Sequence, residues 1–102
     1  MKKVINGKLY NSESARRLGY YSYSNRRDFN FFEETLYITR SGNYFIHGEG
    51  GANSRYSRVI DQNSWGGGED IIPIDEKAAK EWAEKHLDAN EYISIFGEHE
   101  EA

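Results

Sequence analysis

The chain contains no cysteine, a single proline and no long apolar run. Without cysteine, disulfide frameworks, thiolate zinc sites and cysteine nucleophiles are excluded. No segment approaches the roughly 20 apolar residues of a membrane span. The start, Met1 to Gly7, is basic but lacks the apolar run of a signal peptide. These absences predict a cytoplasmic protein that has no contact with membranes.

The sequence also lacks the short motifs of common enzyme classes. No Gly-Lys-Ser/Thr follows the glycine-rich stretches and no G-x-G-x-x-G pattern occurs. The histidines His47, His86 and His99 form no HExxH or related zinc signature. Glu33 and Glu34 are neighbours in a predicted strand, so their side chains point to opposite faces and cannot act as paired acids. We therefore expect no enzymatic activity, no bound metal and no cofactor.

What is present suffices for one small domain. The 102 residues are 37% hydrophobic and 15% aromatic, which allows one modest core. We predict a single α+β domain over residues 1–97, with a small antiparallel sheet of two hairpins plus a short strand. A short N-terminal helix and a C-terminal helical segment are expected to pack on that sheet. Residues 98–102 are expected to form a frayed acidic tail.

The longest strand pattern is an aromatic-rich hairpin between Asp28 and Gly51. Residues 29–40 are rich in Phe, Tyr, Thr, Leu and Ile, which favour strands, and Ser41-Gly42-Asn43 supplies the turn. A two-residue loop would place Ile38 opposite Phe45, whereas a three-residue loop places Tyr37 opposite Phe45.

We favour the three-residue loop because it gathers the aliphatic side chains on one face of the hairpin. That face carries Leu36, Ile38, Tyr44 and Ile46. Tyr37 and Phe45 then share the other face. We expect this aromatic pair to be exposed, where it would close a dimer or meet a foreign partner.

Shorter elements are expected on the N-terminal side of this hairpin. Asn6-Gly7 lies between apolar residues and predicts a first hairpin over residues 3–11 through a type I′ turn. The segment 12–18 predicts a short helix, which Gly19 would end. Residues 20–28 are then expected to form an irregular connection that is rich in tyrosine and arginine.

The C-terminal part predicts one strand and two helices. Residues 71–74 read as a short strand at a sheet edge, because Pro73 has no N–H to donate. Asp75 is expected to cap a helix over residues 76–89, whose inner stripe contains Ala79, Trp82, Ala83 and His86. The pair Asp88 and Glu91 has capping-box spacing for a second helix, which Gly97 would end.

Two glycine-rich stretches, 48–51 and 66–68, lie between the aromatic hairpin and these helices. We expect tight turns or close backbone approach there, because acidic neighbours such as Glu69 would repel phosphate. Trp65 lies in this polar region. Its large area favours a role as a plug of the core over one as an exposed anchor of an interface.

Charge divides the chain unevenly. Residues 1–58 carry a net charge of +5 and residues 59–102 a net charge of −9. Such asymmetry indicates a charged partner for one half, although solvated helix faces are commonly acidic as well. The residues we select for contact with a protein partner are Glu69, Asp70, Glu81, Glu84, Asp88, Glu91, Tyr37, Phe45 and Trp65.

The basic half suggests an alternative partner. Arginines interleaved with tyrosines can bind a phosphate backbone and stack on bases. The residues that would do so are Arg16, Arg17, Arg26, Arg27, Arg55 and Arg58. A third possibility is a small-ligand module, in which the two glycine-rich stretches converge on a pocket.

Seven segments together carry a resemblance to known proteins. They are residues 5–8, 34–37, 44–52, 63–65, 67–69, 79–83 and 91–97. With these segments the chain resembles a family of small proteins encoded by phages and conjugative elements of Gram-positive bacteria. The resemblance implies an accessory protein of a mobile element that acts by binding, for which anti-CRISPR and other anti-defence inhibitors are the precedent. It implies no catalytic residue.

Our leading expectation is therefore a non-enzymatic inhibitor, monomeric or homodimeric, that binds a bacterial CRISPR effector nuclease. The nucleic-acid channels of such nucleases are basic. The acidic C-terminal half is complementary to a surface of that kind.

Overall fold

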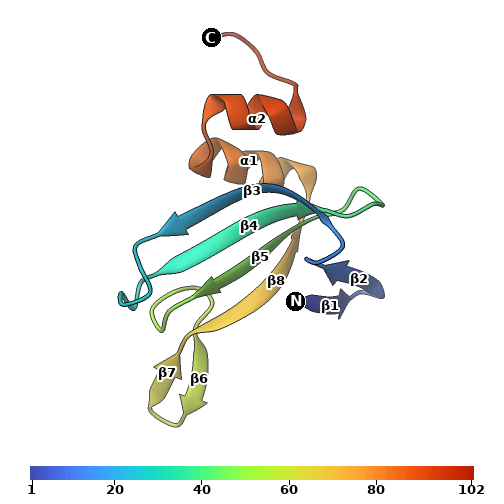
Figure 1. Cartoon of the computed structure of the whole chain (residues 1–102). Helices are drawn as coiled ribbons and strands as arrows, with labels where there is room; N and C mark the ends of the chain where they lie inside the picture. Colours follow the sequence, from blue (N-terminus) through green and yellow to red (C-terminus); the bar gives the residue numbers. More distant parts are fainter.

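The computed structural model describes all 102 residues and shows an α+β fold of eight strands and two helices (Figure 1). In chain order the elements are β1 (Lys2–Ile5), β2 (Lys8–Asn11), β3 (Arg16–Tyr23), β4 (Phe32–Ile38), β5 (Tyr44–Gly50), β6 (Arg58–Asp61), β7 (Ser64–Gly66), β8 (Gly68–Ile74), α1 (Glu76–His86) and α2 (Ala89–Phe96). One four-stranded antiparallel sheet has the order β3-β4-β5-β8. The pairs β1-β2 and β6-β7 form separate hairpins.

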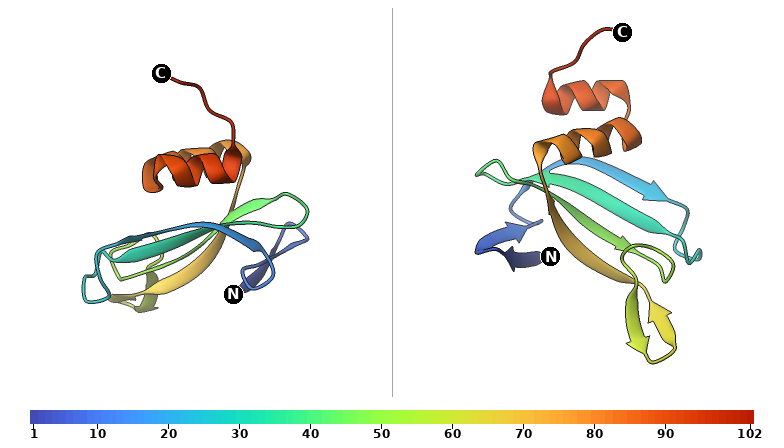
Figure 2. Two further views of the ribbon diagram at one scale, coloured as in Figure 1. Left: turned by 45° about the horizontal axis from the view of Figure 1, so that its top comes forward. Right: turned by 180° about the vertical axis from the view of Figure 1, so that it is seen from behind.

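The four-stranded sheet lies between the two helices and the N-terminal hairpin (Figure 2). On the helix side, Leu36 and Ile46 pack against Ala79 of α1. On the other side, Phe45 packs with Tyr10 of β2 and with the neighbouring β8. Both faces of the sheet are therefore partly covered, and each face has its own small hydrophobic cluster.

The predicted register of the aromatic hairpin is confirmed. Tyr37 pairs with Phe45, and Leu36 pairs with Ile46. The Thr39 N–H donates to the Asn43 carbonyl, which leaves residues 40–42 as the loop, and Gly42 has a φ of +87°. A left-handed φ of this size favours glycine. Local turn chemistry and the apolar pattern therefore specify the same register.

The predicted N-terminal helix is wrong. Residues 16–23 form strand β3, which pairs with β4 along its length, and only one turn of hydrogen bonds forms before it, from Asn11 to Ala15. A helix nucleus this short is marginal in water. Pairing with β4 gives β3 many backbone hydrogen bonds at once. The sheet is consequently larger than predicted, and the tyrosines of residues 20–23 belong to a strand.

Gly19 has a role other than the predicted helix stop. It lies in β3, where an added Cβ atom would fall 2.7 Å from a methyl group of Leu87 and 3.4 Å from the Trp82 ring. Glycine thus allows the C-terminal part of α1 to approach the sheet closely. The first hairpin is also not part of the main sheet, although its turn is as predicted, with φ of 52° at Asn6 and 74° at Gly7.

The two C-terminal helices are confirmed together with their caps. The Asp75 carboxylate accepts a hydrogen bond from the Ala78 N–H at 2.8 Å. Asp88 and Glu91 form both halves of a capping box, and Gly97 ends α2 with a φ of 71°. The first helix is shorter than expected and ends at His86. Neither helix is long and apolar enough to cross a membrane.

Strand β8 lies at one edge of the sheet, as the single proline predicts. Pro73 pairs with Phe45 of the adjacent strand β5. An edge strand pairs on one side only, which is the position where a sheet tolerates proline. Beyond α2, residues 98–102 form no helix or strand, and the Glu98 carboxylate lies 3.3 Å from the Lys80 ammonium.

Candidate functional site

Glu34 of β4 is the one buried charged residue of the protein, and only 4% of its surface is exposed. The Trp82 indole N–H donates to its Oε1 at 2.9 Å, and the Tyr56 hydroxyl donates to its Oε2. A guanidinium nitrogen of Arg55 lies 3.6 Å from the same Oε2. The carboxylate thus connects the sheet to α1 and to the segment after β5, and both of its oxygens have partners.

A cavity of about 570 Å³ opens beside this carboxylate, between the sheet, the segment 53–55 and α1. The residues that line it are Tyr23, Asn30, Phe32, Glu34, Asn53, Ser54, Arg55, Ala78, Glu81, Trp82, Lys85 and His86. Aromatic rings, amides and charged groups all reach this space. No group of three or more His, Asp or Glu side chains is placed to hold a metal ion.

The environment of Glu34 shifts the pKa values of two neighbouring groups. Burial, followed by the hydrogen bond to Glu34, raises the pKa of the Tyr56 hydroxyl far above its usual range. Burial also lowers the pKa of the His86 imidazole, which the charge of Glu34 partly opposes and the charge of Lys85 reinforces. Tyr56 therefore stays protonated as a donor, and His86 is held toward its neutral form.

The lowered pKa of His86 predicts a pH-dependent stability. Between its folded-state pKa and the unfolded value of about 6.5, the unfolded chain binds more protons than the folded one. The free energy of unfolding should therefore fall as the pH decreases through this window and level off below it. Denaturant titrations between about pH 8 and pH 5 should show a smaller decrease for His86→Gln than for the wild-type protein.

The matched control for this prediction is His99→Gln. His99 lies in the exposed tail, and its ring is hydrogen-bonded to the Gly97 carbonyl. This substitution should leave the pH dependence of the wild type unchanged. If His86→Gln and the wild type lose stability equally over the window, His86 does not contribute to the pH dependence of the free energy of unfolding.

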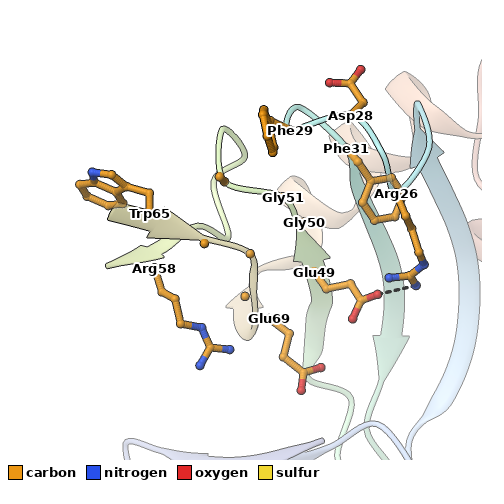
Figure 3. A pocket seen from close by; sticks show the side chains of 14 residues that line it. Arg26, Asp28, Phe29, Phe31, Glu49, Gly50, Gly51, Arg58, Trp65 and Glu69 are labelled. Carbon is orange, nitrogen blue, oxygen red and sulfur yellow. Dashed lines mark hydrogen bonds and ion pairs between the residues drawn. The ribbon is translucent and has the colours of Figure 1, made fainter. Parts of the chain in front are cut away.

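A second cavity, of about 520 Å³, lies where the two glycine-rich stretches meet (Figure 3). Its walls include Gly50, Gly51 and Gly66 to Gly68, so the predicted convergence of these stretches is found. Arg26 is already engaged there, 2.7 Å from the Glu49 carboxylate and 3.0 Å from Glu33. Carboxylates outnumber cations on its walls, which disfavours an anionic ligand.

The small β6-β7 hairpin projects from the sheet as an arm (Figures 1 and 2). Trp65 is 61% exposed on this arm, and Val59 and Ile60 are exposed as well. The prediction that Trp65 plugs the core is therefore wrong. Trp65 pairs with Val59 in a two-stranded hairpin that has no further strand beside it, so no layer covers its ring.

The predicted aromatic face of the main hairpin is not available to a partner. Phe45 is 0% exposed, because Tyr10 of the N-terminal hairpin packs edge-on against it at 5.5 Å between ring centroids. Tyr37 is half-buried and stacks on Phe45 at 5.1 Å. Our expectation of an exposed pair here is wrong, because the short first hairpin folds onto this face.

The six selected carboxylates fall into two groups. Glu69 contacts His47 at 2.9 Å and Asp70 contacts Lys3 at 2.7 Å, so both are engaged within the sheet region. The other four lie on the helical layer and are exposed, and none of them forms an ion pair: Glu81, Glu84, Asp88 and Glu91. The structure thus gathers four of the six on one layer of the protein.

An apolar groove of about 680 Å³ runs between α1, α2 and the C-terminal tail. Its lining combines apolar side chains with acidic ones: Ala83, Glu84, Leu87, Asp88, Ala89, Tyr92, Ile93, His99, Glu100 and Glu101. Ile93 lines this groove and is exposed. The acidic layer therefore also offers apolar contact area.

The six arginines of the nucleic-acid alternative are not gathered on one element. Arg16 and Arg17 lie at the start of β3, whereas Arg26 lies in the segment before β4. Arg55 contacts the buried Glu34, and Arg26 contacts two glutamates. The remaining two, Arg27 and Arg58, come from separate segments. The six arginines therefore come from separate segments, and two of them are already paired with glutamates.

Sequence reasoning missed the Glu34–Tyr56 contact. The burial of Glu34 could have been predicted, because Glu34 shares its strand face with Leu36 and Ile38 on the aliphatic side of the hairpin. Nothing in the sequence indicated that Tyr56, 22 residues later, would reach it. A comparison of this chain with protein-family models, curated proteins and solved structures finds no match.

Proposed function

We propose that the protein is a non-enzymatic inhibitor that binds a bacterial CRISPR effector nuclease through protein–protein contacts. The observation that carries the proposal is the exposed acidic surface of α1 and α2, where Glu81, Glu84, Asp88 and Glu91 form no ion pairs. The channel that holds the guide–target duplex in such nucleases is positively charged. An acidic surface on a small rigid domain is complementary to it and favours fast association.

The groove beside these carboxylates supports contact with a protein rather than with ions alone. Its apolar part contains Leu87, Tyr92 and Ile93, and acidic residues such as Glu84 surround it. Stable interfaces combine an apolar centre with a polar rim. The groove and the acidic helices therefore provide both elements on one side of the molecule.

The proposal is tested with a panel of purified effector–guide complexes from Gram-positive bacteria. Immobilised inhibitor should retain one of them, and added inhibitor should reduce DNA cleavage by the same complex in a dose-dependent manner. Retention should weaken as the salt concentration rises, because exposed charges are screened. If no complex is retained at micromolar concentration, the proposal is wrong.

Charge reversal on the helical layer gives a residue-level prediction. Glu84→Lys should weaken binding to the retained effector by about tenfold at low salt, since an attractive charge becomes a repulsive one. Glu84 is exposed and is not part of a helix cap, so the fold should be unaffected. Binding is measured by surface plasmon resonance, and most of the change should lie in the association rate.

The matched control is Glu13→Lys, which changes the net charge by the same amount. Glu13 is exposed between β2 and β3, far along the chain from the helices, and forms no ion pair. It should leave the affinity within about twofold of the wild type. Equal loss of affinity in the two variants would show that net charge, and not the helical layer, drives binding.

A further inference from the structure

The cavity beside Glu34 is lined by four aromatic rings, those of Tyr23, Phe32, Trp82 and His86, and the ring of Tyr21 packs against two of them. Tyr23 stacks on Phe32 at 5.7 Å with an interplanar angle of 17°, and Phe32 contacts Tyr21 at 5.9 Å. Tyr21 in turn lies 4.1 Å from the His86 ring, which lies 5.3 Å from Trp82. The rings come from β3, β4 and α1. A planar ligand can stack on such a wall.

Polar groups reach the same space from other elements. Besides the carboxylates of Glu34 and Glu81, the cavity is lined by the amide side chains of Asn30 and Asn53 and by two cations, Arg55 and Lys85. Arg55 approaches Glu34 through a single nitrogen and its side chain is 61% exposed, so its other N–H donors are open to a ligand. Lys85 forms no ion pair. Amides and cations therefore stand beside an aromatic wall.

The buried carboxylate holds part of the cavity wall in place. Glu34 holds Trp82 on one side and Tyr56 on the other, and no buried side-chain polar atom lacks a partner. A preorganised site binds with less entropic cost than one that must be ordered. Its volume of about 570 Å³ lies within the range of small-molecule sites.

We propose that this cavity binds a planar heteroaromatic ring that carries an anionic group, with the size and charge of a nucleoside monophosphate. The ring stacks on the wall at Tyr23 and Phe32. The amides of Asn30 and Asn53 meet polar atoms at the ring edge, and the anion meets Arg55 and Lys85. This goes beyond the proposed inhibition, because it requires no protein partner. Of the acidic helical surface only Glu81 borders this cavity.

The fluorescence of Trp82 provides a direct reading of occupancy. In a Trp65→Phe background Trp82 is the only tryptophan, and it lines the cavity whereas Trp65 lies on the arm. Titration with AMP, GMP, CMP and UMP should produce a saturable change for at least one of them, with the affinity confirmed by calorimetry. No saturable signal for any of the four would overturn the proposal.

Three further titrations separate the parts of the ligand. The matching nucleoside and inorganic phosphate should each bind at least tenfold more weakly than the preferred nucleotide. Equal binding of the nucleoside would overturn the role given to Arg55 and Lys85, and equal binding of phosphate would overturn the role of the rings. A short single-stranded oligonucleotide that binds where no mononucleotide does would assign the wall to a nucleic-acid strand and overturn the proposal.

Paired variants assign the contacts to residues. Tyr23→Ala should weaken the nucleotide about tenfold or more, whereas Tyr20→Ala should not change its binding. Both tyrosines are exposed on β3, but Tyr20 donates to Glu33 on the opposite face. Likewise Lys85→Gln should weaken binding severalfold, and Lys77→Gln, an exposed lysine of α1 outside the cavity, should not. If the members of each pair behave alike, the cavity is not the site.

Discussion

Replacing Glu34 by alanine should lower the free energy of unfolding by about 3 kcal/mol, which is a large part of the stability of a small domain. The substitution removes the only acceptor of the Trp82 N–H and of the Tyr56 hydroxyl. A buried donor without a partner costs about 1–3 kcal/mol. Arg55 also loses its contact with Glu34, but it is largely exposed and water can solvate it. This loss therefore adds little to the fall in the free energy of unfolding. Urea unfolding followed by circular dichroism should show a lower midpoint with an unchanged slope.

The neighbouring residue provides the control for this prediction. Glu33 contacts Tyr20 at 2.6 Å and Arg26 at 3.0 Å on the opposite, more solvated face of the sheet. Glu33→Ala should therefore cost less than about 1 kcal/mol. Glu34→Gln retains the shape and one acceptor and should lie between the two alanine variants. A loss for Glu34→Ala no larger than that for Glu33→Ala would contradict the structural role of the buried carboxylate.

The parts of the fold that the sequence predicts are those set by nearby residues. The Asn6-Gly7 turn, the loop at residues 40–42 and the Asp75 cap each depend on side chains a few positions apart. The same holds for the capping box of α2. Each of these features is formed mainly by local backbone geometry, so composition and spacing suffice to place it.

Strand β3 shows where local signals fail. Serine, alanine and arginine between residues 12 and 17 suit a helix, and Gly19 suits a helix stop. The chain instead pairs with β4 and brings Gly19 against the Trp82 and Leu87 side chains. Both contacts depend on residues nine or more positions away. Tertiary pairing thus overrides a weak local propensity.

The candidate sites also differ in how far they depend on local signals, and therefore in how well the sequence predicts them. Helical spacing predicts which carboxylates face outward, and the structure exposes Glu81 and Glu84 on α1 accordingly. The burial of Phe45 and the exposure of Trp65 depend instead on which hairpin folds over which face. The aromatic cavity likewise joins β3, β4 and α1, whose approach no local pattern encodes.

Of the ten glycines, Gly48 leaves the least room for a Cβ atom, and this leads to the second large effect. Gly48 of β5 lies directly beneath the ring of Tyr56, and a Cβ atom at this position would overlap the ring and its hydroxyl. Gly48→Ala should therefore displace Tyr56 and break its hydrogen bond to Glu34. Overpacking together with the lost hydrogen bond should lower the free energy of unfolding by about 3 kcal/mol. The measurement is again urea unfolding.

Two comparisons separate this steric effect from the general cost of altering a glycine. Gly66→Ala should be nearly neutral, because its Cβ atom meets only the end of the exposed Ile60 side chain, which can rotate away. A Tyr56→Ala background should make Gly48→Ala much less harmful, since the overlapping ring is absent and the two changes are no longer additive. If Gly48→Ala costs as much in that background as in the wild type, the ring is not the obstacle. This result would contradict the packing of Tyr56 over β5.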